Sequence, residues 1–581
     1  MNPIRVHISR WHCRYLAVVL ACLVSGAPAF AQTAPILQRL SPNTVFYAEW
    51  RGSNFLADAQ QKNHLLQLLH DPAFAPVWSA AAAELQQRAQ KAGGQAANPA
   101  LAPLVPEMIS LLENPLALGF VVNPTAMKAA APDMPESPFA YFLAFDTTGK
   151  ADLIQKWRAL AAAGNKTPAD VTKYDFGGTS VEVRTTGKNK SYSAQAGNYF
   201  VSSDQKQVIE DLITRFQSAS VPAASLTQIP EFAQSRKYVG DNAALEFFAR
   251  VPDMSQWNPT EKTAKSMLQV VKSIHLEKIH VMASGVSFDG EATRMRGAVL
   301  GDTSAGGLFD LAGASSGAFQ TQPLVEGGTA FSMSRMNYAA MYQVLRDAIF
   351  SNLEPGQAAQ VGALEGAAQG FLGVSIPDAL KLFTGEFAST TNYTDDGTAE
   401  QVFAATIQKP DAVLRVIRAL IGTMIVGEDS SGSTTFLDVA YPYTDPSTHQ
   451  RRRKFYYVAV TPQAVLAAPR KALLREALQR LMPQAADPPA GVFANLQYVQ
   501  LRSRLPEKLS GLGGADLTQI PWGKLMQNFA DQISKAGTQA NGQPPPDLSS
   551  LKLDTISRYL HISVSGWWKD ANGVYFDSYI Q

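Results

Sequence analysis

The chain has 581 residues, more than one hydrophobic core usually spans, so two or more domains are expected. Hydrophobic residues make up 46% and charged residues 17%, which is typical of a globular chain and argues against a disordered one. The formal net charge of +1 becomes −2 (1 − 3) without the three arginines of residues 1–31, which excludes a strong positive field for gathering nucleic acid.

The first 31 residues, Met1–Ala31, are predicted to be a cleaved export signal. Three arginines precede the apolar run Tyr15–Val24, and Ala29-Phe30-Ala31 has the small-x-small pattern of a cleavage site. The run is shorter than the roughly 20 residues that a membrane-spanning helix needs. Cys22 leaves one alternative open, a lipoprotein anchored through that residue. We therefore expect an exported, periplasmic protein.

Cleavage after residue 31 would remove Cys13 and Cys22, the only two cysteines. The mature chain would then have no disulfide, no thiol nucleophile and no cysteine metal site. The most apolar later segment, Val413–Val426, is interrupted by Arg415 and Arg418, so we expect no transmembrane segment after the signal.

In chain order, the first part of the mature sequence alternates short strands with helices. The predicted elements are a strand Thr44–Trp50, a leucine-rich helix around 65–69, an alanine-rich helix 76–91, strands Leu116–Val122 and Phe139–Phe145, a helix 150–163, and strands Val171–Phe176 and Ser180–Thr185. A strand–turn–strand–helix unit, Ser191–Phe216, follows. The same kind of unit returns at Tyr456–Leu481.

Matching elements surround both units in the same order. The closest local match is His280–Gly285 with His561–Gly566, each in an alternating strand that precedes a turn; Leu245–Val251 is matched with a predicted strand Val492–Val499. The sequence therefore predicts a tandem duplication, with repeats at 42–301 and 328–581. The segment between them, 302–327, is rich in Gly, Ala and Ser and is predicted to be a linker with one helical turn at Leu308–Leu311.

The hairpins and local helices favour an α+β fold over a doubly wound parallel sheet. Each repeat is expected to have a mostly antiparallel sheet covered by helices on one side.

Two sets of residues are candidates for catalytic or metal-binding groups. Gly313-Ala-Ser315-Ser-Gly317 matches the nucleophile elbow of α/β-hydrolases in its letters, but it lies in the predicted linker, without the strand and helix that an elbow needs. His280 and His561 have no second histidine or carboxylate two residues away along the strand, so we interpret them as half-buried strand residues. The sequence thus predicts no catalytic residue, no metal ligand and no cofactor.

Three features distinguish the second repeat and are candidates for function. Arg451, Arg452, Arg453 and Lys454 form the densest charge run, interpreted as the solvated end of a hairpin or, alternatively, as a contact for an anionic lipid or envelope polymer. The neighbours Trp567 and Trp568 should point to opposite faces of a strand, so one of them is a candidate contact aromatic. The third feature is the proline-containing insertion Gly537–Ser550.

Several stretches together resemble a family of uncharacterised bacterial exported proteins, domain-of-unknown-function family 3352. They are the opening strand motif Pro42–Tyr47, the leucine helix that ends at Asp71-Pro72, the turns at 111–117 and 382–388, and the hairpin Gly197–Ser203. The resemblance covers most of the mature chain and implies no activity or catalytic residue.

These observations favour a non-catalytic envelope protein that binds or organises a partner of unknown identity. The first alternative is a periplasmic carrier of a lipid or another hydrophobic ligand. The second is a hydrolase whose active site is assembled from distant residues.

Overall fold

The computed structural model describes mainly residues 36–74, 112–123, 139–156, 170–251, 275–444, 450–481, 491–525 and 554–581, apart from a few positions within these ranges. The predicted leader Met1–Ala31, the predicted helix 76–91 and the insertion Gly537–Ser550 lie outside the described residues.

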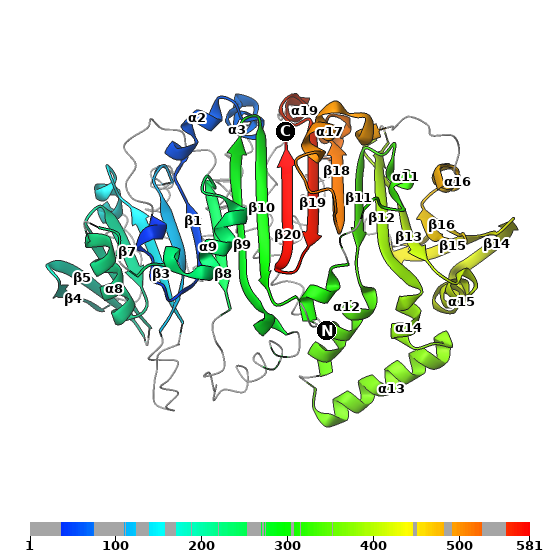
Figure 1. Ribbon diagram of the computed structural model, residues 1–581, viewed down its shortest axis with the longest axis horizontal. Coiled ribbons are helices and arrows are strands. Elements are labelled where there is room, and N and C mark those ends of the chain that lie inside the picture. The colour runs from blue at the N-terminus through cyan, green and yellow to red at the C-terminus, as the bar shows by residue number, and fades with distance from the viewer. Residues whose placement is uncertain are drawn as a thin grey trace.

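The described strands form one sheet of 20 strands, and every strand pair in it is antiparallel (Figure 1). The first half contributes β1 (Thr44–Trp50), β2 (Leu116–Val122), β3 (Phe139–Asp146), β4 (Asp170–Phe176), β5 (Thr179–Thr186), β6 (Asn189–Ala196), β7 (Tyr199–Ser203), β8 (Leu245–Arg250), β9 (Ile279–Asp289) and β10 (Ala292–Gly301). The second half contributes β11 (Ala330–Arg335), β12 (Phe383–Tyr393), β13 (Ala399–Ile407), β14 (Ile425–Ser431), β15 (Thr434–Thr444), β16 (Arg451–Val460), β17 (Ala464–Ala468), β18 (Gly511–Asp516), β19 (Ile562–Lys569) and β20 (Gly573–Ile580).

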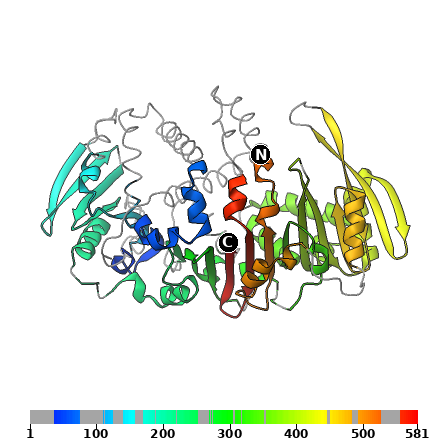
Figure 2. The same ribbon diagram turned by 90° about the horizontal axis from the view of Figure 1, so that it is seen from above.

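The pairings give the two halves the same strand order. From its outer edge inward, the first half runs β4-β5-β6-β7-β3-β2-β1-β8-β9-β10. The second half runs β14-β15-β16-β17-β13-β12-β11-β18-β19-β20. Figure 2 shows the outer strands of the two halves, cyan and yellow, at opposite ends of the molecule, with the red C-terminal strand between them.

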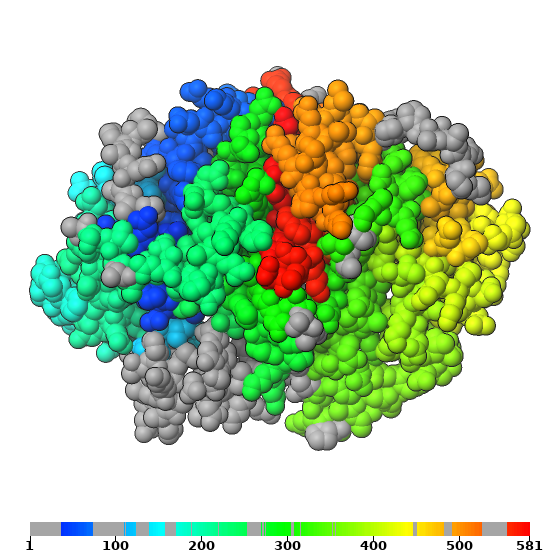
Figure 3. All heavy atoms as spheres, in the orientation of Figure 1, coloured from blue at the N-terminus to red at the C-terminus, as the bar shows by residue number. Residues whose placement is uncertain are grey.

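The halves meet where β10 pairs with β20, so the expectation of a separate sheet in each repeat is wrong. Gly285 faces Arg296 within the first half, and Gly566 faces Asp577 within the second, so Arg296 and Asp577 hold corresponding positions. They are also direct partners across this seam, which Figure 3 shows in the middle of the molecule. Arg294 Nη2 pairs with Asp577 Oδ2 at 2.5 Å, and Arg296 Nε lies 3.8 Å from the same oxygen. In two identical repeats these corresponding positions would carry the same charge and would repel each other across the seam. Here an arginine lies opposite an aspartate, so the two charges attract.

Two helices from each half cover one face of the sheet, which we call the helix face. The first half places α8 (Lys206–Gln217) and α9 (Pro230–Val239) there, and the second places α16 (Lys471–Leu481) and α17 (Leu496–Arg502) there. On α8 the buried residues Val208, Ile209, Leu212, Ile213 and Phe216 recur with the spacing of an amphipathic helix.

Other helices pack elsewhere, so the expectation of helices on one side only is also wrong. Leu66 and Leu69 of α3 (His64–His70) pack with Trp50 on the opposite face, and Val413 of α15 (Pro410–Ile421) packs there with Val460. The remaining helices are α2 (Ala57–Gln60), α11 (Gln322–Val325), α12 (Tyr338–Phe350), α13 (Pro355–Leu372), α14 (Ile376–Lys381) and α19 (Asp554–Tyr559). No helix within the described part of the chain has the length and apolar character to cross a bilayer.

Gly285 and Gly566 hold corresponding strand positions, and each lies directly beneath side chains that pack on the helix face. A Cβ atom on Gly285 would lie 2.5 Å from Cγ1 of Val239, and one on Gly566 would lie 2.9 Å from Cδ1 of Leu505. At both distances the neighbouring side chain would have to move, so glycine at these two strand positions leaves room for the residues that pack on the helix face.

One predicted strand is not formed. Residues Val492–Val499 lie in a 3₁₀ turn, η9 (Gly491–Ala494), and in α17, while β18 is the strand that corresponds to β8. Asn495 caps α17, because its Oδ1 accepts hydrogen bonds from the backbone N–H groups of Gln497 and Tyr498. Residues 302–327, which join the two halves, are called the connecting segment. The helical turn predicted in it at Leu308–Leu311 is present as the 3₁₀ turn η7 (Gly307–Leu311).

Candidate functional site

An apolar pocket of about 360 Å³ lies at the seam, on the side of the sheet opposite the helix face. It is lined by strands of both halves and by the connecting segment, and the lining includes Met282, Val299, Leu311, Met336, Trp567 and Val574. All the described residues that line it are apolar. The volume falls in the usual range of small-molecule sites, roughly 300–1,000 Å³, and the lining suits a hydrocarbon chain.

A row of apolar side chains leads along the same face to this pocket. Successive cross-strand partners in the row are Phe120, Phe46, Ala249, Met282, Val299 and Val574. The Phe46 and Phe120 rings are 6.1 Å apart, and Phe120 and Met282 are 47% and 40% exposed. A contiguous, partly exposed apolar surface of this kind marks an interaction or ligand site more often than isolated exposed residues do.

The two predicted contact tryptophans lie on opposite faces of β19. Trp567 lines the apolar pocket and packs over Gly511, while Trp568 packs into the cores of the helix face and stacks on Tyr575 with 5.5 Å between ring centroids. Alternation along the strand accounts for this difference. Trp567 is therefore the member of the pair that a ligand could contact.

The four predicted basic residues lie far from this pocket in the sheet order. Arg451, Arg452, Arg453 and Lys454 begin β16, and all four are exposed. The structure thus does not bring the two predicted groups of contact residues into one site.

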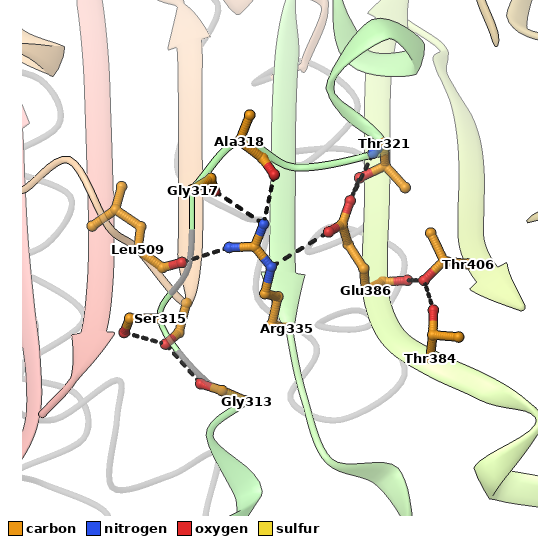
Figure 4. A network of polar contacts seen from close by, with 11 residues as sticks. Gly313, Ser315, Gly317, Ala318, Thr321, Arg335, Thr384, Glu386, Thr406 and Leu509 are labelled. Carbon is orange, nitrogen blue, oxygen red and sulfur yellow. Dashed lines mark hydrogen bonds and ion pairs between the residues drawn. The ribbon is translucent and has the colours of Figure 1, made fainter.

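A hollow of about 650 Å³ with a mixed polar and apolar lining lies beside the connecting segment and contains Arg335 and Glu386, direct partners on β11 and β12. The Arg335 guanidinium donates to the carbonyls of Leu509 at 2.7 Å, Gly317 at 3.1 Å and Ala318 at 2.9 Å, and its Nε lies 3.4 Å from Glu386 Oε2 (Figure 4).

Glu386 completes the attachment of the connecting segment. Its Oε1 accepts hydrogen bonds from the backbone N–H and the hydroxyl of Thr321, at 2.6 and 2.8 Å. The Arg335–Glu386 pair therefore holds residues 317–321 against the sheet, and its charges are directed at the protein itself.

Ser315 of the hydrolase-like motif is held by hydrogen bonds to other parts of the chain. Its hydroxyl lies 2.8 Å from that of Ser510 and 2.9 Å from the backbone nitrogen of Lys569, which donates to it. The described residues that follow it reach a helix only at Gln322, so no strand-to-helix elbow presents the hydroxyl. This serine ties the connecting segment to β18 and β19.

Histidines do not form a metal site in the described residues. His280 is exposed on β9, while His561 precedes β19 and contacts His64 of α3, with ring centroids 5.3 Å apart. Among the described residues, no three side chains of His, Cys, Asp or Glu gather closely enough to hold a metal ion.

The sequence reasoning missed a buried carboxylate pair on the helix face. Glu49 and Glu246 are direct partners on β1 and β8, and they are 1% and 2% exposed. Tyr47 Oη donates to Glu246 Oε1 at 2.6 Å, and Arg236 pairs with the other oxygen of Glu246.

Glu49 has no ion pair or hydroxyl partner of this kind, although a backbone hydrogen bond from Leu37 and the charges of Arg51 and Arg236 favour its ionised form. Its Oε2 is buried, without a hydrogen bond to any described group. Burial first, and then the charge of Glu246, raise the pKa of the Glu49 carboxyl to about 7. Glutamates at these inward positions of otherwise apolar strands, in Tyr47-Ala-Glu49 and Leu245-Glu246-Phe247, are the sequence signal that could have revealed the pair.

Comparison with known proteins gives no match. No family model matches the chain, and neither a curated protein nor a solved structure matches it significantly.

Proposed function

We propose that this is a non-catalytic exported protein that binds the hydrocarbon part of a lipid in the apolar pocket at the seam. The observation that carries the proposal is the continuous row of apolar partners from Phe120 to Val574, which ends at a pocket lined by apolar side chains. A hydrocarbon chain gains roughly 0.8 kcal/mol for each methylene group that such a surface removes from water.

Strands of both halves supply side chains to the pocket, so the pocket forms only when the two halves pair. We infer that the halves arose by tandem duplication; the shared strand order and the matched glycines Gly285 and Gly566 support this. Membership of domain-of-unknown-function family 3352 and export through the leader belong to the same proposal. Neither the resemblance nor the leader supplies an activity.

The connecting segment supports binding more than catalysis. Arg335, Glu386 and Ser315 offer the ion pair and hydroxyl that a hydrolase would use, but their described hydrogen bonds fasten residues 313–321. The same segment supplies Leu311 to the pocket wall. Its attachment thus keeps the wall of the pocket in place.

Trp567 allows a direct test by fluorescence. Titration of residues 32–581 with a brominated stearic acid should quench tryptophan emission, because bromine quenches only at short range. Trp567→Phe should lose most of this quenching, since Trp567 lines the pocket. Trp568→Phe is the matched control and should keep it, because Trp568 packs on the helix face. Unquenched wild-type protein, or equal loss in both variants, would contradict the proposal.

A further inference from the structure

The β15–β16 hairpin extends beyond its neighbouring strands. β14 pairs with β15 only as far as Val439, and β17 pairs with β16 only from Tyr457 onward. In the sheet, the backbones of residues Tyr441–Thr444 and Arg451–Phe455 are therefore strand partners only of each other or of Ala440, and we call these nine residues the basic arm. Figure 2 shows the yellow hairpin reaching beyond the rest of the second half.

The corresponding hairpin of the first half has no such extension. The sequence match aligns Ser191 with Tyr456, and these residues face Arg184 and Val439. Beyond this rung, the first hairpin adds two pairs and turns after Thr186, while the second adds five, from Ala440↔Phe455 to Thr444↔Arg451. The strand order common to both halves is thus complete without the basic arm, which is an addition that the shared fold does not require.

The composition of the basic arm is cationic and aromatic. Four of its nine residues are Arg or Lys, and none of the nine is acidic. Tyr441 and Phe455 are 51% and 46% exposed, although both are large and apolar enough to be buried in most proteins.

Cross-strand pairing distributes these groups over both faces of the ribbon. Tyr441 is opposite Lys454 and Tyr443 is opposite Arg452, so two tyrosines and two cations share one face. The other face carries Phe455 and Pro442 together with Arg451 and Arg453. Each face therefore combines positive charge with an apolar or amphipathic ring.

We propose that the basic arm docks the protein on the surface of a bilayer that contains anionic lipid. Each Arg or Lys near such a surface strengthens binding by roughly fivefold. Tyrosine is enriched at the membrane–water interface, where its ring lies at the level of the headgroups. The arm presents both kinds of side chain on a ribbon that no other described strand covers.

A soluble polyanion would use only part of this surface. Its phosphate, sulfate or carboxylate groups would pair with the cations, but they would leave Phe455 and Pro442 in water. A bilayer accepts these apolar groups at the boundary of its acyl chains, and their burial adds to the charge attraction. The exposed apolar residues therefore favour the bilayer as partner.

Vesicle flotation tests the proposal. Residues 32–581 should float with phosphatidylcholine vesicles that contain phosphatidylglycerol, should not float with pure phosphatidylcholine, and should be released by high salt because salt screens surface charge. Replacing Arg451, Arg452, Arg453 and Lys454 together by Gln should weaken binding by at least about 100-fold.

A matched control distinguishes binding by these four residues from an effect of the protein's net charge. Replacing the exposed lysines Lys62, Lys173, Lys190 and Lys237 by Gln removes the same total charge from the first half and should leave flotation unchanged. Equal loss in both quadruple variants, or wild-type protein that does not float at low salt, would overturn the proposal.

The aromatic residues distinguish a bilayer from a polyanion. Tyr441→Ser, Tyr443→Ser and Phe455→Ser together should weaken flotation but leave retention on an anionic resin unchanged. Unchanged flotation would overturn the bilayer and assign the arm to a soluble polyanion. The quadruple arm variant should still show brominated-acid quenching at Trp567, so this test and the test of the pocket fail independently.

Discussion

The same place in the sheet holds two carboxylates in the first half and two apolar side chains in the second. In the first half, Glu49 faces Glu246, which faces Gly285. In the second half, Met333 faces Leu512, which faces Gly566, the counterpart of Gly285. Met333 and Leu512 are buried in an apolar core, 1% and 6% exposed.

The difference shows that this fold does not require the carboxylate pair. A buried carboxylate must lose its hydration, and well-packed apolar residues of similar volume often stabilise a core at least as well. The two glutamates also differ from each other, because Arg236 and Tyr47 hold Glu246 while Glu49 Oε2 has no hydrogen-bonding partner among the described groups. Exchanging residues between the halves tests each part of this comparison.

The largest effect is expected when Glu246 is replaced by its counterpart, as Glu246→Leu. This change leaves the Arg236 guanidinium without its buried partner, and breaking a buried ion pair costs about 3–5 kcal/mol. Denaturant unfolding at neutral pH should show the loss. The double variant Glu246→Leu with Arg236→Met should recover most of it, because the guanidinium that lost its buried partner is then removed as well. Wild-type stability in Glu246→Leu would disprove the assigned role of the ion pair.

The opposite sign is expected for Glu49→Met. Burial raises the pKa of Glu49 from 4.5 to about 7, so between these values the folded chain keeps a proton that the unfolded chain releases. The stability of the wild-type protein should therefore fall as pH rises through this window, and Glu49→Met should remove that fall. At about pH 8 the variant should be more stable by up to about 3 kcal/mol.

Unfolding curves across pH measure this difference. Met333→Leu, a change of similar volume at the corresponding position, is the control and should leave the pH dependence of the wild-type protein unchanged. A pH profile of Glu49→Met that parallels the wild-type profile would show that Glu49 is ionised in the folded chain.

Local sequence patterns predicted most of the strands and the α+β class, because alternation and turn residues act over short distances. The patterns at Ser191–Phe216 and Tyr456–Leu481 predicted hairpins and helices that the structure contains. The strand expected at Val492–Val499 failed because tertiary packing of Tyr498 and Leu501 selects a helix for an apolar segment compatible with either structure. The single sheet could not be anticipated, since β10 and β20 are almost 300 residues apart.

The pocket at the seam could not be predicted from the sequence. Alternation along one strand placed Trp567 and Trp568 on opposite faces, but it could not say that Met282 and Val574 are brought together from different halves. Pockets of this kind are assembled from side chains with ordinary strand periodicity, so no local motif marks them. The basic run at Arg451–Lys454 was recognisable because charge density is a local property.

The smallest effect concerns the contact between α3 and α19, which also joins the halves. Burial lowers the pKa of His64, with Glu291 opposing the shift and His561 adding to it. The folded chain therefore favours neutral His64, and the stabilisation is present above the ordinary pKa of 6.5 and is lost as pH falls through the lower folded value. Acidification should loosen this contact while leaving the paired strands of the seam intact.

Hydrogen exchange, corrected for its intrinsic pH dependence, can follow this contact. Protection of residues 64–70 and 554–559 should decrease on acidification in the wild-type protein and should decrease less in His64→Gln. His280→Gln is the control, because His280 is exposed on β9. If both variants behave alike, the His64–His561 contact does not sense pH. If the loss of protection on acidification is smaller in His64→Gln but not in His280→Gln, the two halves are joined by a pH-dependent contact between α3 and α19 as well as by the strand pairing of the seam.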